Sequence, residues 1–215
     1  MRRSRWVVAV VVAVAVVIAV AALRRPPAED ETVQPSLSLD ESSIQFVRPK
    51  VIGMQDGIRQ WELETDRMRE QGNLIYLEGI HRGMLYREDE EYLTFVADEG
   101  IWDRRRDQLT LTGSVVVYRD GEKLLESERI VWDGRSEILT SPGPVQLWLD
   151  DYSIRADEMI GDVNKDELLF RGNVDVASDR MMLSLPDQLV YRVEDGSMSG
   201  VGPGTLQIMI RRENG

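Results

Sequence analysis

Apolar and polar residues alternate along most of the chain after residue 43. In the stretch 168–176, Leu168, Phe170, Gly172, Val174 and Val176 fall on one side, and mostly polar residues fall between them. A period of two is typical of a β-strand with one buried face. No segment after residue 25 has a helical period. We therefore expect an antiparallel all-β domain over residues 44–211.

The alternation belongs to a repeat of about 30 residues. Each copy contains a small residue followed by an acid, and a glycine follows that acid after 13 residues in the first copy and 15 in the other four. The five pairs are Thr65-Asp66, Ala97-Asp98, Ser127-Glu128, Ala156-Asp157 and Pro186-Asp187, and the glycines are Gly79, Gly113, Gly143, Gly172 and Gly202. A residue that recurs once per copy usually has a structural role. We interpret the acids as strand-end carboxylates that accept backbone N–H bonds, and the glycines as tight turns or close backbone approaches.

Each copy is expected to form two strands joined by a turn, with Gly72, Gly121, Gly134 and Gly196 marking hairpin turns. Stacked hairpins that curl over their apolar face would form a jelly-roll-like or slit-barrel trough; a solenoid of similar rungs is the alternative. Alignment of the copies places one apolar set on the inward face. Its members are Leu63, Phe95, Leu111, Val115, Val117, Leu125, Leu139, Val145, Leu147, Ile154, Leu168, Phe170, Val174 and Val176, with Leu77 and Leu109 beside them.

The amino-terminal segment from Trp6 to Leu23 is an unbroken apolar run of 18 residues. As a helix it would span about 27 Å, close to the thickness of the hydrocarbon core of a bilayer. Three arginines precede it and two follow it, so the positive-inside rule favours a cytoplasmic tail over residues 1–5. The sequence predicts a single transmembrane helix over 6–23. The alternative is a cleavable signal peptide that ends at Ala19-Val20-Ala21, and both interpretations export the remaining chain.

Composition separates a linker from an acidic domain. Residues 24–43 are rich in Pro, Ser and acids, which is typical of a solvated linker. Residues 26–215 contain 21 Lys and Arg against 38 Asp and Glu. Such a negative domain is not suited to nucleic acid, because phosphate contacts need a basic surface.

The sequence offers little for catalysis. The chain has no cysteine and one histidine, His81. It contains no phosphate loop, dinucleotide fingerprint or nucleophile elbow. A lone histidine supports neither a catalytic triad nor a histidine-rich metal site. We expect no enzyme, no metal site and no cofactor.

The repeat resembles a known pattern. The segments YLTFVADEGIWD…LTLTGSVVV and YSIRADEMIGD…ELLFRGNVDV are similar to the OstA-like repeat of lipopolysaccharide-transport proteins. A short cytoplasmic tail, one transmembrane helix and one such domain together resemble the LptC family. The regular middle copies also resemble the soluble LptA-type bridge, and the apolar segment favours LptC.

The resemblance implies a location and a set of partners. LptC-like proteins sit in the inner membrane as single-pass proteins, with a periplasmic β-jelly roll beside an ABC transporter. That domain accepts lipopolysaccharide and passes it to an LptA-like protein by edge-strand pairing, while the acyl chains lie inside the trough. The inward apolar set named above would then be the lipid-binding face. Burial is favourable by about 0.8 kcal/mol per CH₂ group, so a hydrocarbon trough suits such a cargo.

Two other hypotheses stay open at the level of sequence. The domain could be a membrane-tethered β scaffold with a dry core that assembles by edge pairing without lipid. It could also be a glycan-binding β repeat, which would need a carboxylate pair or an aromatic platform on its outer face.

Overall fold

The computed structural model describes residues 44–208 except 56–57, 88–89 and 150. The predicted tail 1–5, transmembrane helix 6–23 and linker 24–43 lie outside the described residues. Within the described part, no helix is long and apolar enough to cross a membrane.

The described residues form β-strands and one short 3₁₀ turn. In chain order the strands are β1 Ile44–Val47, β2 Lys50–Gln55, β3 Ile58–Gln71, β4 Leu74–Arg87, β5 Glu90–Asp103, β6 Gln108–Arg119, β7 Glu122–Asp133, β8 Ile138–Ser141, β9 Val145–Trp148, β10 Ser153–Ala156, β11 Glu158–Asp162, β12 Glu167–Arg171, β13 Val174–Ala177, β14 Met181–Leu185, β15 Gln188–Arg192, β16 Met198–Val201 and β17 Thr205–Ile208. The 3₁₀ turn η1, Val163–Lys165, connects β11 to β12.

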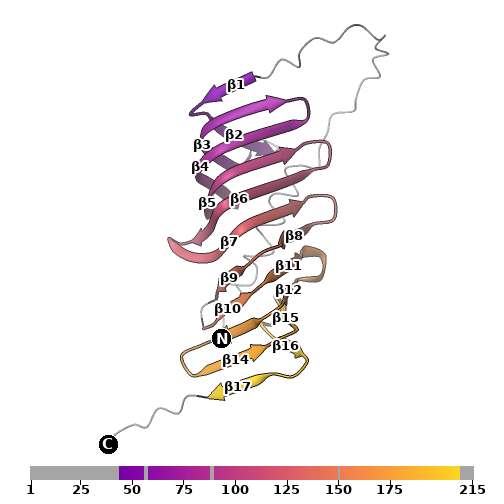
Figure 1. The fold of residues 1–215 in the computed structure, drawn as a ribbon. Coiled ribbons are helices and arrows are strands. Elements are labelled where there is room, and N and C mark those ends of the chain that lie inside the picture. Colours follow the sequence, from indigo (N-terminus) through magenta and orange to yellow (C-terminus); the bar gives the residue numbers. More distant parts are fainter. Residues whose placement is uncertain (1–43, 56–57, 88–89, 150, 209–215) are drawn as a thin grey trace, which may run out of the picture.

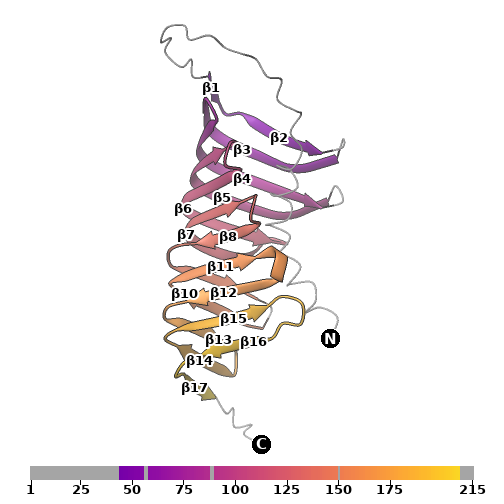
Figure 2. The same cartoon turned by 90° about the vertical axis from the view of Figure 1, so that its right-hand side faces the viewer.

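The strands form two walls that share a corner. Strands β3 to β7 are 12–14 residues long, and the pairing between neighbours shifts register near their middles, so their two halves lie in different walls. The first wall starts at β2 and continues past β7 through β9, β10, β13, β14 and β17. The second wall starts at β1 and continues past β7 through β8, β11, β12, β15 and β16. Figures 1 and 2 show the strands stacked as rungs from β1 and β2 at one end to β17 at the other.

All pairings among the described residues are antiparallel. This confirms the predicted antiparallel all-β class. The chain crosses the corner, turns back and crosses it again on the next rung. A parallel β-helix solenoid would instead coil in one direction, so the solenoid alternative does not describe the fold, and the rolled sheet is jelly-roll-like.

The repeated acids and glycines meet in space at the corner. A Cβ atom on Gly79, Gly113, Gly172 or Gly202 would collide with the carboxylate of Asp66, Asp98, Asp157 or Asp187, respectively, and all four glycines have positive φ. The carboxylates also hold the corner by hydrogen bonds. The backbone N–H of Ser114 donates to Asp98 Oδ2 at 3.0 Å, and Asn173 Nδ2 donates to Asp157 Oδ2 at 2.8 Å. This confirms a structural role for these four aspartates, and the expected backbone N–H bond is seen at Asp98.

The corner of the third copy is built differently. Glu128 replaces the aspartate, and a Cβ on Gly143 would meet nothing within 4 Å. In place of the contact between carboxylate and glycine, this corner contains a hydrogen bond between two buried hydroxyls, with Ser127 Oγ 2.6 Å from Ser141 Oγ. The Ser141 hydroxyl also donates to the carbonyl of Gly143 at 3.3 Å.

The core lies between the walls and runs along the stack. Buried residues of both walls form one hydrophobic cluster that extends from Leu77 to Val193. The alternation seen in the sequence explains it, because every second side chain of a strand points to the same face. In β5, for example, Leu93, Phe95 and Ala97 are buried while their neighbours are more exposed.

Candidate functional site

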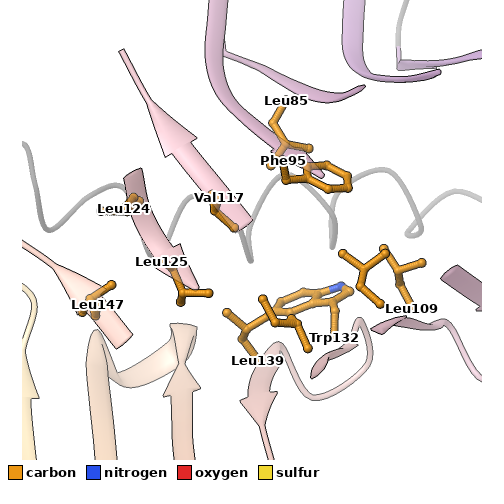
Figure 3. Close-up of a pocket in the computed structure, with 11 residues that line it drawn as sticks. Leu85, Phe95, Leu109, Val117, Leu124, Leu125, Trp132, Leu139 and Leu147 are labelled. Atoms are coloured by element: carbon orange, nitrogen blue, oxygen red, sulfur yellow. The ribbon is translucent and has the colours of Figure 1, made fainter. Parts of the chain in front are cut away.

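A hydrocarbon-lined cavity lies between the two walls, at the level of strands β4 to β9 (Figure 3). Its volume is about 40 Å³. From the first wall it is lined by Leu85, Phe95, Val117, Leu124, Leu125 and Leu147, and from the second wall by Leu109, Leu111, Ile130, Trp132 and Leu139. The cavity therefore lies between two walls that are joined at the corner by continuous backbone.

Local sequence positions these side chains. Phe95 follows the alternation of β5, and its ring occupies the space directly over Gly83 of the neighbouring strand, where a Cβ atom would come within 2.5 Å of Phe95 Cε1. In the second wall, Trp132 pairs in register with Leu109 of β6 and Leu139 of β8. Three adjacent rungs thus present large apolar groups on one face.

The structure places the predicted inward set between the walls. Thirteen of its fourteen members are buried in the core cluster, and Leu63 is half-buried and packs against it. Six of them line the cavity: Phe95, Leu111, Val117, Leu125, Leu139 and Leu147. The remaining buried members are Val115, Val145, Ile154, Leu168, Phe170, Val174 and Val176, which are 0–2 % exposed. Most of these lie on β9 to β13, where the inward side chains are almost completely buried.

The predicted inward set lacks four residues that line the cavity, namely Leu85, Leu124, Ile130 and Trp132. A fifth, Leu109, was placed on the inward face but not among the lipid-binding residues. The inward set came from the place three residues before each acid and from the places around each repeat glycine, and the first four residues lie elsewhere. The alternation of Ile130 and Trp132 after the acid Glu128 carries the signal that could have found them. Leu124 departs from the alternation because the pairing of β6 and β7 shifts register between Val117 and Tyr118.

The rims of the walls, opposite the corner, are made of hairpin turns such as Asp120-Gly121 in the first wall and Gly134–Glu137 in the second. Among the described residues, no strand pairing joins the two rims. A side-chain contact does cross between the walls near the rims, where the rings of Trp61 and Trp102 meet edge to face with centroids 6.3 Å apart. The walls are thus held by apolar contact there and by continuous backbone at the corner.

Charged groups lie on the outside of the walls. Lys123 Nζ donates to Glu126 Oε2 at 2.6 Å on the first wall, and this hydrogen bond raises the pKa of Lys123. At the β2 edge, a hydrogen bond to Glu62 raises the pKa of Lys50. Among the described residues, no cluster of His, Asp and Glu side chains could hold a metal ion. Glu62 itself is buried, but the lining of the cavity contains no charged residue.

Fold and interior together define a class, that of antiparallel β-roll proteins built around a hydrocarbon-lined interior. The family model of LptC-related lipopolysaccharide-assembly proteins matches residues 10–179, so the chain belongs to the LptC family. This membership gives the protein a role in lipopolysaccharide transport, in a family of transport components rather than enzymes.

Comparison with solved structures finds a further likeness. LptH, the LptA-homologous periplasmic component of the lipopolysaccharide transport device of Pseudomonas aeruginosa, is 14% identical, with 56% of this chain and 95% of that chain covered and a TM-score of 0.45. A sequence comparison with curated proteins found no match.

Proposed function

We propose that this protein is a membrane-anchored relay for lipopolysaccharide. It accepts the lipid from an inner-membrane ABC transporter, holds the acyl chains between its two walls and passes them to an LptA-like protein. The observation that carries the proposal is the cavity whose eleven lining residues present apolar surface from both walls. Acyl chains in an aqueous compartment need such shielding, and burial of each CH₂ group stabilises the bound state by about 0.8 kcal/mol.

The small volume of the cavity sets a condition on loading. At about 40 Å³ the cavity is far smaller than one of about 150 Å³, which holds a molecule the size of benzene, so acyl chains need the walls to move apart. The rims support such a movement, because apolar contact, as between Trp61 and Trp102, holds them there. In this proposal the corner acts as the hinge line of the two walls, and the transporter supplies the energy.

The two ends of the stack support handover by strand pairing. At one end β1 is exposed along its whole length, and at the other so is β17. Apolar side chains stand on these edges, among them Ile44, Val47, Leu206 and Ile208, which are 54–78 % exposed. Unpaired apolar edges are normally an aggregation hazard. An edge that receives a strand from a partner removes that hazard.

Residues 6–23 provide the anchor in this proposal, with residues 1–5 in the cytoplasm and the β domain in the periplasm. The anchor precedes β1 in the chain, so the β1 and β2 end is the one tethered near the membrane. The β16 and β17 end then points away from the membrane, toward the LptA-like partner.

The substitution Val117→Asp tests the proposal. It places a carboxylate on the cavity wall, where burial of the unpaired charge costs several kcal/mol, so we expect lipid transfer to fall about tenfold or more. Transfer is measured from proteoliposomes that contain the transporter and this protein to a soluble LptA-like acceptor, with ATP. Thr110→Asp, on the outer face of the same strand, is the control and should transfer normally. A folded Val117→Asp variant that transfers lipid at the normal rate would overturn the proposal.

A second candidate function rests on the complete burial of the inward side chains of strands β9 to β13. Ile154, Phe170, Val174 and Val176 are completely buried there. A protein that only bridges other components by edge pairing would need such a dry core throughout. In that case Val117→Asp would affect folding alone, and no lipid would bind between the walls.

A further inference from the structure

The indole N–H of Trp132 is a buried hydrogen-bond donor without a partner. The side chain is 2 % exposed, and its Nε1–H donates no hydrogen bond. Trp132 is the penultimate residue of β7, next to the rim turn of the second wall. Buried tryptophan N–H groups usually find an acceptor, so this one calls for an explanation.

The lining of the cavity around the indole offers no acceptor side chain. The other ten residues that line the cavity are leucine, isoleucine, valine and phenylalanine, and Figure 3 shows the indole among them, near Leu109, Leu139 and Phe95. An ordered water would need two to four polar partners, and the side chains here provide a single donor. In the closed cavity these side chains cover the N–H, so an occupant that parts the walls must be mostly hydrocarbon and must carry an acceptor if the donor is to be satisfied.

We propose that Trp132 donates this hydrogen bond to a carbonyl oxygen of an acyl ester or amide linkage of the transported lipid. The inference rests on the proposed function and deepens it by assigning a specificity-determining residue. An acylated amphiphile carries its linkage carbonyls at the junction between the hydrocarbon chains and the polar head. Hydrocarbon alone would leave the donor unsatisfied, whereas a linkage carbonyl satisfies it.

The position of Trp132 along β7 fits this junction. Between Trp132 and Glu128 at the corner lie four residue steps, or about 13 Å of strand at 3.3 Å per residue. Ile130 continues the apolar lining along this path. A carbonyl held at Trp132 leaves the polar head outside the rim and directs the chains toward the corner. Trp132 would thus fix the depth at which the lipid sits.

The test compares two lipids on the full-length protein in detergent. One probe is a glucosamine disaccharide with ester- and amide-linked acyl chains. The other is an analogue whose chains of the same length are all attached to a glucose disaccharide through ether linkages, so that it lacks the carbonyls and carries no added charge. One hydrogen bond corresponds to a preference of about 3- to 10-fold for the carbonyl-containing lipid. We expect the wild-type protein to show this preference and Trp132→Phe to lose it.

The control is Trp148→Phe, which removes an indole N–H from the side of β9 that faces away from the buried Val145 and Leu147. It should keep the preference of the wild type. If Trp132→Phe lowers thermal stability, the comparison is repeated with 3-benzothienylalanine incorporated at position 132, which exchanges the N–H for sulfur and keeps the shape of the ring.

The outcomes separate this inference from the proposed function. An equal preference in the wild type and the position-132 variants, with tight binding in both, overturns the hydrogen bond and leaves the relay standing. Failure of the wild type to bind either lipid overturns both.

Discussion

The corner of the roll is built from a carboxylate that occupies the place of a missing side chain. At Gly113, with φ of +91°, a Cβ would collide with the carboxylate of Asp98, and that carboxylate accepts the N–H of Ser114. The same contact recurs at Gly79, Gly172 and Gly202. A glycine is needed there for two reasons: the backbone is in the left-handed region, and there is no space for a Cβ atom beside the carboxylate.

Substitution of the corner glycines tests this account. Gly113→Ala forces a non-glycine residue into a positive φ and displaces Asp98, so we expect a loss of about 1–3 kcal/mol in the free energy of unfolding. Gly143→Ala is the matched control, because Gly143 has the same place in the repeat, no close neighbour and no positive φ. It should change stability by less than about 0.5 kcal/mol. Urea unfolding followed by circular dichroism measures both, and equal losses would contradict the role of the corner contact.

At the scale of the element, much could be predicted from sequence. The turns at Gly72, Gly121, Gly134 and Gly196 all connect successive strands, because their residue types favour turn conformations. The stretch 168–176 reads as one continuous strand, but the structure divides it into β12 and β13 at Gly172 and Asn173. Phe170 of β12 and Val174 of β13 are both in the core. The corner bends the backbone without changing the buried face, so the alternation alone does not reveal it.

The sequence pattern did not predict which strands each half of a long strand pairs with. A bend near the middle of β3 to β7 sends the two halves to different walls, and this requires the register shifts between strands. Trp132 was missed for a related reason. The alternation after Glu128 places it on the inward face, but no local pattern encodes that this face of the second wall meets Phe95 and Val117 of the first wall.

The strand β17 supports a prediction about assembly. Leu206 is 54 % exposed on this edge strand and pairs in register with Leu183. A lysine on an edge strand opposes pairing with another chain. We expect Leu206→Lys to weaken binding of an LptA-like partner about tenfold, which is about 1.4 kcal/mol, with little change in stability. Ile101→Lys, on the exposed outer face of β5, is the control. Partner affinity measured by biolayer interferometry should fall for Leu206→Lys alone, and unchanged affinity would exclude β17 as the docking edge.

At the scale of the whole molecule, the fold separates three environments. Charged residues cover the outer faces, apolar residues fill the interior, and unpaired edges with exposed apolar side chains close the two ends. A lipid relay needs these three features together: solubility outside, shelter for acyl chains inside and a way to join the next component. The central claim is that the lipid passes between the two walls.

In-cell photocross-linking tests that claim most directly. A photoreactive residue is placed at Phe95, Val117, Leu147 or Phe170 on the inward face, and at Thr110 or Asn173 on the outward face as controls. The account predicts lipopolysaccharide adducts from the inward positions alone, which disappear when the ATPase of the transporter is disabled. A folded protein that gives no lipid adduct at any inward position, or equal adducts on both faces, would contradict it.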